Sequence, residues 1–372
     1  MSNNPNRMPL IDSLKAVAAL LVLLNHFSSY GPLAEGAREL LPALTTWCYE
    51  YGRMAVQVFL VIAGFLAARG LSANGEALAG SPLPLIWKRY LRLAVPYLAA
   101  IGLAIIAAAI ADHWFDDEMI PDRATFGQWL AHAALLHGIL GIDALSAGVW
   151  YIAIDFQLFA LMAILLWAGR WRLVAPALVL AVALPSLFWF NRDAAWDNWA
   201  IYFFGSYGLG AAAWWASDRR QMSAWLGVIA TIVIAALVVD FRLRIALALG
   251  VALLLGFGRR SGLLESWPTA RPLAFLGQIS YSVFLVHFPV LLLANGLYAR
   301  LGLESAGSAL TMLVLAIGAS IAAATAFYRW IESPEASRRI TAALGWLFDT
   351  AVGYASKVPV VGPLLNLVLR RA

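Results

Sequence analysis

The chain has 372 residues, of which 62% are hydrophobic and 13% charged, and its mean hydropathy is +0.77. Soluble domains are typically about 45–50% apolar and about 25% charged, so this composition excludes a soluble, disordered or collagen-like protein and indicates an integral membrane protein. The single cysteine excludes an intrachain disulfide, and the formal net charge of +5 fits basic cytoplasmic loops better than a nucleic-acid partner.

A transmembrane helix needs roughly 17–25 mostly apolar residues. The first candidate is not a cleavable signal, because no small-residue cleavage site follows it. We therefore expect an all-α, polytopic helix bundle with about ten transmembrane helices. The predicted spans are 14–30, 54–71, 93–111, 150–168, 173–190, 199–216, 224–239, 242–257, 279–298 and 308–328.

An eleventh apolar stretch, residues 126–141, is short and carries His132 and His137. If it does not cross and the N-terminus is cytoplasmic, 19 of the 26 basic residues lie inside; if it crosses, only ten do. The positive-inside rule favours the first arrangement, with both termini cytoplasmic and the stretch lying at or dipping into the outer face. The basic residues then expected outside are Arg38, Arg53, Arg123, Arg192, Arg242, Arg244 and Arg300.

Residues 1–339 are expected to form one membrane domain, and residues 340–372 a C-terminal tail. The apolar part of that tail, residues 358–369, contains Pro359 and Pro363. It is too short and too broken for a span, so we expect an amphipathic segment at the membrane interface.

Ionisable side chains within spans are the most informative residues, since each costs about 2.5–3.5 kcal/mol at a helix centre. In the first span, Lys15 and His26 are eleven residues apart, which is roughly 16 Å of helical rise and places them on one face. A neutral imidazole can accept a hydroxyl proton near pH 7, so His26 is a candidate general base. The alternative is a histidine hydrogen-bonded at the outer interface.

A basic run precedes the third predicted span, and in it Arg89 and Arg92 have the i,i+3 spacing that lets two guanidinium groups face one way. Such a pair suits a phosphate-bearing ligand from the cytoplasm. The alternative is ordinary positive-inside anchoring.

Two further spans carry ionisable residues. Asp155 lies about one and a half turns inside the fourth span and needs a partner, either His26 or an arginine; it either orients an imidazole or ties two helices together. His287 precedes Pro289 in the ninth span, where the missing proline N–H leaves a carbonyl free to satisfy a core histidine. The sequence contains no metal-site spacing, no Walker loop and no serine-centred elbow.

Together these motifs resemble the membrane acyltransferase-3 family, integral-membrane O-acyltransferases that modify bacterial surface polysaccharides. The departures are Lys15 for the usual arginine, Asp155 for the usual glutamate and Phe156 for a frequent second acid, which indicates a divergent branch. The matching segments are IDSLK at 11–15 followed by His26, VFLVIAGF at 58–65, KRYLR at 88–92 with PY at 96–97, residues 150–159, residues 277–289 and residues 329–334.

The resemblance implies transfer of an acyl group, by default acetyl, from cytoplasmic acetyl-CoA or another acyl-CoA to a hydroxyl of a cell-surface or exported carbohydrate, in the bacterial inner membrane and without a metal. We expect the stand-alone form of the family. The implied roles are a base for His26; orientation of that base for Asp155 and Asp12; coenzyme binding for Arg89, Arg92 and Lys15; and a substrate pocket for Tyr281, His287 and Trp150.

Two other functions stay open. A proton-coupled secondary transporter or exporter would use intramembrane His and Asp equally well. A non-catalytic component of a polysaccharide synthesis complex would need the bundle but not the histidine. The expected partners are the lipid bilayer, acyl-CoA, a carbohydrate acceptor and polysaccharide assembly proteins, with no nucleic acid.

Overall fold

The computed structural model describes residues 7–171, 175–218, 224–340 and 342–343, and every regular element within these ranges is a helix. The predicted all-α class is confirmed for this part of the chain. Each of the ten predicted spans overlaps one long helix: α1 (Pro9–Phe27), α4 (Val56–Leu71), α5 (Leu83–Asp112), α7 (Trp150–Ala168), α8 (Ala175–Phe188), α9 (Ala200–Ala216), α10 (Ala224–Val239), α11 (Leu243–Ser261), α14 (Ser280–Arg300) and α15 (Ala306–Phe327).

Several of these helices are long and apolar enough to cross a membrane, so the chain is a multi-pass membrane protein. α9 and α10 have only 17 and 16 residues, and α11 carries three arginines. The count of ten spans and the cytoplasmic position of both ends stay predictions. Within the described residues the seven sufficient stretches are Pro9–Phe27, Pro42–Leu71, Leu83–Asp112, Trp150–Ala168, Ala175–Arg192, Ser280–Arg300 and Ala306–Glu332.

Shorter helices connect the long ones and were not predicted. Three of them begin with proline at the first or second position, where the missing N–H costs nothing. They are α2 (Gly31–Leu40), α3 (Pro42–Tyr51), α6 (Phe126–Ala133), α12 (Leu263–Ser266) and α13 (Arg271–Gln278), with the single turns η1 (Gly52–Ala55), η2 (Gly169–Trp171), η3 (Phe190–Arg192) and η4 (Ala194–Trp196).

Helix α5 begins ten residues before its predicted start. Pro84, near its first residue, fits the free N-terminus of a helix, so the basic run from Lys88 to Arg92 belongs to the helix itself. That the run precedes the membrane-spanning part of this 30-residue helix stays a prediction. Arg89 thereby projects from a rigid helix toward neighbouring helices rather than from a loop.

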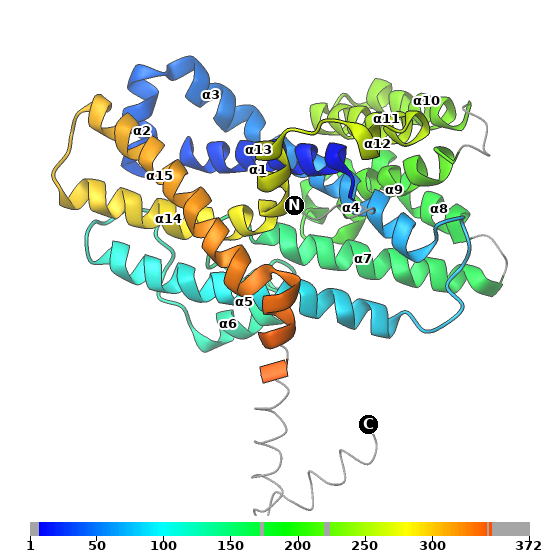
Figure 1. Ribbon diagram of the computed structural model, residues 1–372, viewed down its shortest axis with the longest axis horizontal. Helices are drawn as coiled ribbons and strands as arrows, with labels where there is room; N and C mark the ends of the chain where they lie inside the picture. The colour runs from blue at the N-terminus through cyan, green and yellow to red at the C-terminus, as the bar shows by residue number, and fades with distance from the viewer. Residues whose placement is uncertain (1–6, 172–174, 219–223, 341, 344–372) are drawn as a thin grey trace, which may run out of the picture. The chain divides into compact units, whose positions relative to one another are not determined.

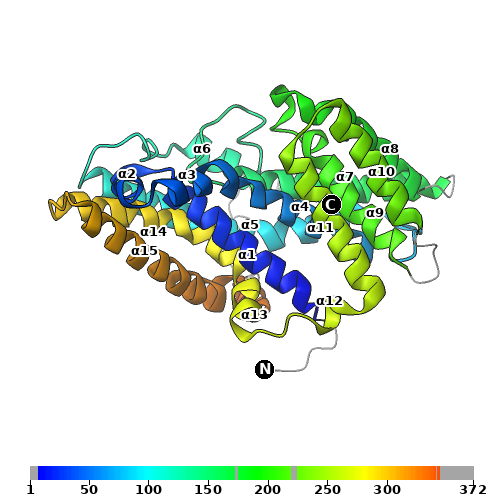
Figure 2. The same ribbon diagram turned by 90° about the horizontal axis from the view of Figure 1, so that it is seen from above.

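The long helices form two groups with α1 between them (Figure 2). Helices α8 to α11 gather on one side, and α2 with α14 lies on the other. Helix α5 packs against both α14 and α7 and so connects the two groups (Figure 1). The connection matters because the polar residues of the site come from α1, α5, α7 and α14.

Helices α4 and α9 make the closest backbone approach in the bundle. A Cβ atom added at Gly64 would lie 1.8 Å from the Tyr207 carbonyl oxygen, and one added at Gly210 would lie 2.0 Å from that of Val61. Small residues let membrane helices approach closely, and this contact replaces the hydrophobic drive that lipid does not supply. Nearly every residue of α9 is buried, so α9 is the interior helix of its group.

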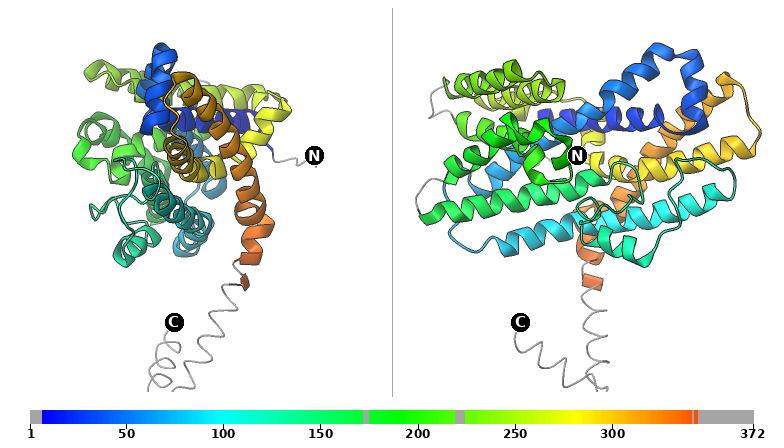
Figure 3. Two further views of the ribbon diagram at one scale, coloured as in Figure 1. Left: turned by 90° about the vertical axis from the view of Figure 1, so that its left-hand side faces the viewer. Right: turned by 180° about the vertical axis from the view of Figure 1, so that it is seen from behind.

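The segment between α5 and α7 folds back along α5 (Figure 3). The Tyr90 hydroxyl donates to the Ala133 carbonyl at 2.7 Å, and the Tyr97 and His132 rings lie parallel at 6.4 Å. Tyr97 is about 22 Å of helical rise from Asp112, where α5 ends. Helix α6 has eight residues and is by itself too short to cross a hydrocarbon core of about 30 Å. That the stretch 126–141 does not span stays a prediction.

The chain divides into two compact units, Met1–Thr325 and Ala326–Ala372. In the second unit, η5 (Tyr328–Glu332) is a π-helix, and Arg339 and Glu335 form an exposed ion pair one turn apart. The predicted boundary at residue 339/340 therefore stays a prediction. The predicted interfacial segment at residues 358–369 lies outside the described residues.

Candidate active site

The closest polar contact of His26 is a second histidine. Its Nδ1 lies 2.6 Å from Nε2 of His287, and the two rings are nearly parallel with centroids 4.9 Å apart. His287 is fully buried in α14, whereas His26, in the last turn of α1, is half-buried. Two residues separated by 261 positions in the sequence thus meet in one pair.

The hydrogen bonds of this pair fix the tautomer of both rings. Nδ1 of His287 lies 3.0 Å from the Val283 carbonyl, which can only accept, so that nitrogen carries the proton. Nε2 of a neutral His287 is then an acceptor, and Nδ1 of His26 must donate to it. The lone pair of His26 is left on Nε2, for which the described residues provide no hydrogen-bond partner. An imidazole oriented by a third group with one free basic nitrogen is the arrangement of a general base.

A glycine two residues before α7 approaches the His26 ring directly. Gly148 has φ +79°, and a Cβ atom there would lie 3.2 Å from Cε1 of His26 and 3.3 Å from the Phe284 ring. Glycine adopts this backbone conformation without strain and leaves room for the imidazole. Tyr30 also packs on His26, with ring centroids 5.6 Å apart. The His26 ring is therefore held between α1, α14 and the segment that leads into α7.

Asp155 forms an ion pair with Arg89, not a contact with His26. Nη2 of Arg89 lies 2.5 Å from the Asp155 carboxylate, whose side chain is 5% exposed, and the guanidinium lies 5.3 Å from the centre of the Phe159 ring. The prediction left His26 and an arginine open as partners, and the structure selects the arginine. Asp155 ties α5 to α7, so it does not orient the imidazole by direct contact.

Two polar atoms near this ion pair are buried without a hydrogen-bond partner. They are Nε of Arg89 and the Tyr207 hydroxyl, and Tyr207 is close enough to both charges to interact electrostatically with them. An unsatisfied buried donor costs about 1–3 kcal/mol, so such atoms mark a place where a ligand or water would bind.

The other predicted residues lie apart from the histidine pair. Asp12 pairs with Arg7 at 2.8 Å, about 21 Å of helical rise from His26, so the expectation that it orients His26 conflicts with the geometry. Arg92 is exposed, whereas Arg89 is half-buried and pairs with Asp155, and Lys15 is half-buried in α1.

Two residues predicted to line a substrate pocket, Tyr281 and Trp150, contact neighbouring helices instead of His26. The Tyr281 hydroxyl donates to the Leu93 carbonyl at 3.1 Å and joins α14 to α5. Trp150 is 38% exposed and stacks on Phe203, with ring centroids 5.6 Å apart. Neither residue touches His26 through a contact that the structure records.

A second histidine pair lies in the segment that folds back along α5. The rings of His132 and His137 stack at 4.2 Å, both are buried, and neither ring nitrogen of His137 has a partner. Burial lowers the pKa of His132, and burial together with the neighbouring His132 lowers the pKa of His137 to about 4. Both rings are therefore neutral at pH 7. Their spacing of five residues did not reveal the stack, because it forms only after α6 ends.

Comparison with known proteins decides the family. A family model described as an acyltransferase domain, that of the acyltransferase-3 family, matches residues 9–329. The chain belongs to the acyltransferase-3 family. The resemblance inferred from the sequence motifs is thereby confirmed, and membership places the chain among acyltransferase enzymes. Within the described residues no three His, Cys, Asp or Glu side chains gather as a metal site would require.

One curated relative is the peptidoglycan O-acetyltransferase OatA of Listeria monocytogenes. It is 22% identical over 370 residues, which cover 88% of this chain and 55% of the relative. The chain thus spans about half the length of that relative. No solved structure matches the chain significantly.

Proposed function

We propose that this acyltransferase moves an acetyl group from cytoplasmic acetyl-CoA to a hydroxyl of a cell-surface or exported carbohydrate, in the inner membrane of a bacterium. The observation that carries the proposal is the His26–His287 pair, which leaves one basic nitrogen free in a chain of this family. A relative whose name describes O-acetylation of peptidoglycan supports an acetyl group and a carbohydrate acceptor.

In the proposed reaction, Nε2 of His26 takes the proton of the acceptor hydroxyl while the oxygen of that hydroxyl attacks the thioester carbonyl. The tetrahedral intermediate then collapses, the carbon–sulfur bond breaks, and the imidazolium returns its proton to the leaving thiolate. His287 accepts the hydrogen bond from Nδ1 of His26 throughout and so keeps the ring in the reactive tautomer. The role resembles that of the third member of a catalytic triad.

On the donor side we propose that Arg89, Arg92 and Lys15 serve the coenzyme. The unsatisfied Nε of Arg89 supports a ligand near the ion pair, and exposed Arg92 supports a contact with a phosphate. Lys15 shares the His26 face of α1, along which a pantetheine chain would pass. The Asp155 carboxylate holds Arg89 in place for that contact.

The test is transfer of radiolabel from acetyl-CoA. Purified protein in lipid vesicles, given labelled acetyl-CoA and a cell-envelope carbohydrate extract, should release free coenzyme A and label the carbohydrate. A proton-coupled transporter would accumulate a solute but label nothing, and a non-catalytic component would do neither. The absence of label in every carbohydrate fraction, together with no coenzyme A release, would contradict the proposal.

A further inference from the structure

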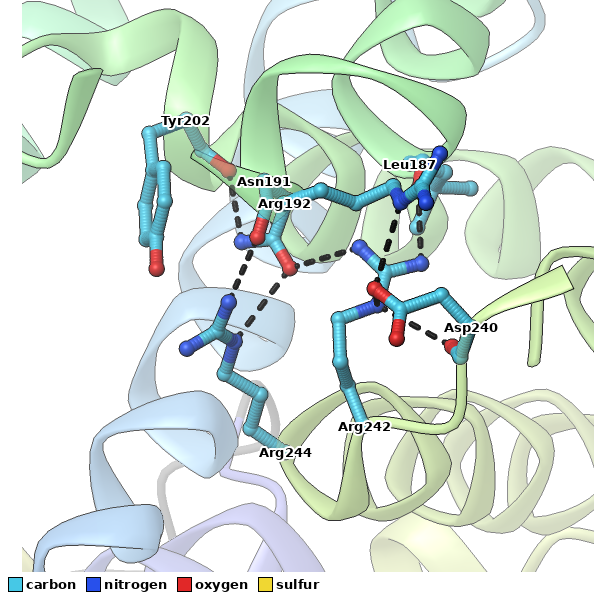
Figure 4. A network of polar contacts seen from close by, with 7 residues as sticks. All are labelled: Leu187, Asn191, Arg192, Tyr202, Asp240, Arg242 and Arg244. Atoms are coloured by element: carbon cyan, nitrogen blue, oxygen red, sulfur yellow. Dashed lines mark hydrogen bonds and ion pairs between the residues drawn. The ribbon is translucent and has the colours of Figure 1, made fainter. Parts of the chain in front are cut away.

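Three of the seven arginines expected on the outer side meet in one cluster (Figure 4). We name Arg192, Arg242 and Arg244 the arginine cluster. The Asn191 side-chain oxygen accepts from Nη1 of Arg242 at 3.0 Å and from Nε of Arg244 at 3.2 Å. Asn191 is 2% exposed and donates to the Tyr202 carbonyl at 2.9 Å, so one buried amide fixes two guanidinium groups.

The cluster has more positive than negative charge. Asp240 lies 3.2 Å from Nε of Arg192 and 3.5 Å from Nε of Arg242 and compensates one charge. Within the described residues Arg244 has no ion pair, and its guanidinium lies 5.1 Å from the Tyr202 ring centre. Three guanidinium groups with one carboxylate leave two positive charges, and like charges gathered in one place favour an anionic ligand.

An apolar groove of about 490 Å³ lies between α8, α9 and α10 and ends at Leu187, beside the cluster. Leu187 links the two, because its side chain lines the groove and its carbonyl accepts from Nη2 of Arg242 at 2.8 Å. From Pro176 to Leu187 the groove follows α8 for about 16 Å, and Asn74, Gly75 and Trp215 line its other end. Its walls include Leu180, Leu184, Leu187, Gly208, Trp225 and Val228.

Exposed aromatic residues place the cluster at the level of lipid headgroups. Trp189 and Phe241 are 73% and 70% exposed, and each lies within three residues of a cluster arginine. Exposed tryptophan marks the interface between hydrocarbon and water. Groove walls facing the lipid, such as Leu180 and Val228, are 40% and 44% exposed. A molecule lying here has its charge beside the arginine cluster and its chain along α8.

From these features we infer that the arginine cluster and the groove bind one anionic phospholipid of the outer leaflet, with its phosphate at Arg192 and Arg244 and one acyl chain between α8 and α10. Arg242 is structural, since its three nitrogens bind Asp240, Asn191 and Leu187. The site uses no residue of the proposed acyl transfer.

Native mass spectrometry of the full-length protein in mild detergent tests this site. The probes are phosphatidylglycerol and phosphatidylcholine with identical acyl chains. An arginine at the membrane surface changes anionic-lipid binding by about fivefold, so the wild type should retain phosphatidylglycerol at least tenfold better than phosphatidylcholine. The double variant Arg192→Gln/Arg244→Gln should lose this preference. Val228→Trp, which fills the groove from its exposed wall, should weaken both lipids.

The matched control is Arg123→Gln, an exposed arginine on the same expected side but outside the cluster. It should bind both lipids as the wild type does. Equal retention of the two lipids by the wild type, or an unchanged preference in the double variant, would overturn the headgroup assignment. Unchanged binding in Val228→Trp would overturn the position of the chain. Circular dichroism would confirm that each variant keeps its helices, and Arg192→Gln alone offers a milder change, because that side chain is 45% exposed.

Discussion

His287 acts on His26 through a hydrogen bond whose direction is imposed by a backbone carbonyl. The Val283 carbonyl accepts the hydrogen bond from Nδ1–H of His287, so Nε2 of the neutral His287 ring can only accept. In the proposed mechanism this chain of three groups makes His287 a positioning residue rather than a pocket wall.

We expect His287→Phe to lower kcat about 100-fold or more while the KM for acetyl-CoA changes less than threefold, because His26 loses the acceptor that fixes its tautomer. His287→Gln, whose amide oxygen can still accept, should recover part of the loss. Steady-state kinetics on the vesicle assay measure both variants. A kcat within threefold of wild type in His287→Phe would show that the pair has no catalytic role.

Removing either charge of the Arg89–Asp155 ion pair should lower the free energy of unfolding. Removing one partner of a buried ion pair typically costs about 3–5 kcal/mol, because the other charge is left uncompensated. Arg89→Gln and Asp155→Asn should each lower the unfolding temperature, and the double variant should recover part of the loss. Glu335→Gln, in an exposed pair, should have almost no effect and is the control. Additive losses in the double variant would mean that the two charges are independent.

At the scale of helices, the features that depend only on neighbouring residues were predicted correctly. Apolar length located all ten long helices, because hydrophobic runs and helical rise are local properties. The short helices α2, α3 and α6 were not predicted, because their residues are too few or too polar for a span. The partners of His26 and Asp155 were not predicted uniquely either, since they lie on helices whose packing depends on the entire bundle.

The histidine stack of the folded-back segment should make the protein sensitive to acid. The pKa of His137 is lowered to about 4, so between about pH 6.5 and pH 4 the unfolded chain binds more protons than the folded one. Stability therefore rises with pH across this window and is lost on acidification, by up to about 3 kcal/mol. The unfolding temperature of the wild type should fall from pH 7 to pH 5, and that of His137→Phe should fall less. An identical pH dependence in both proteins would exclude His137 as the cause.

For the whole molecule, the direction of α7 to α14 depends on whether residues 126–149 cross the membrane. In a Cys48→Ala background, a cysteine at exposed Ala195 should react with a membrane-impermeant thiol reagent on intact cells, and one at exposed Thr269 should not. The charge distribution is the reason, because it places 19 of 26 basic residues inside only if this segment turns back. The reverse labelling pattern would mean that the segment crosses and that the arginine cluster faces the cytoplasm.

In the proposed mechanism, donor and acceptor meet at one histidine. Arg89 and Arg92, the proposed coenzyme ligands, lie on α5, whereas His26, the proposed base, lies in the last turn of α1.

The most direct measurement is acetyl transfer by His26→Ala compared with wild type in the same vesicles. The label assay described above is run on both proteins after matched purification and circular dichroism. Our account predicts that label transfer falls by about 100- to 10,000-fold, because the variant has lost its general base. Transfer within threefold of wild type by a correctly inserted His26→Ala protein would contradict the central claim.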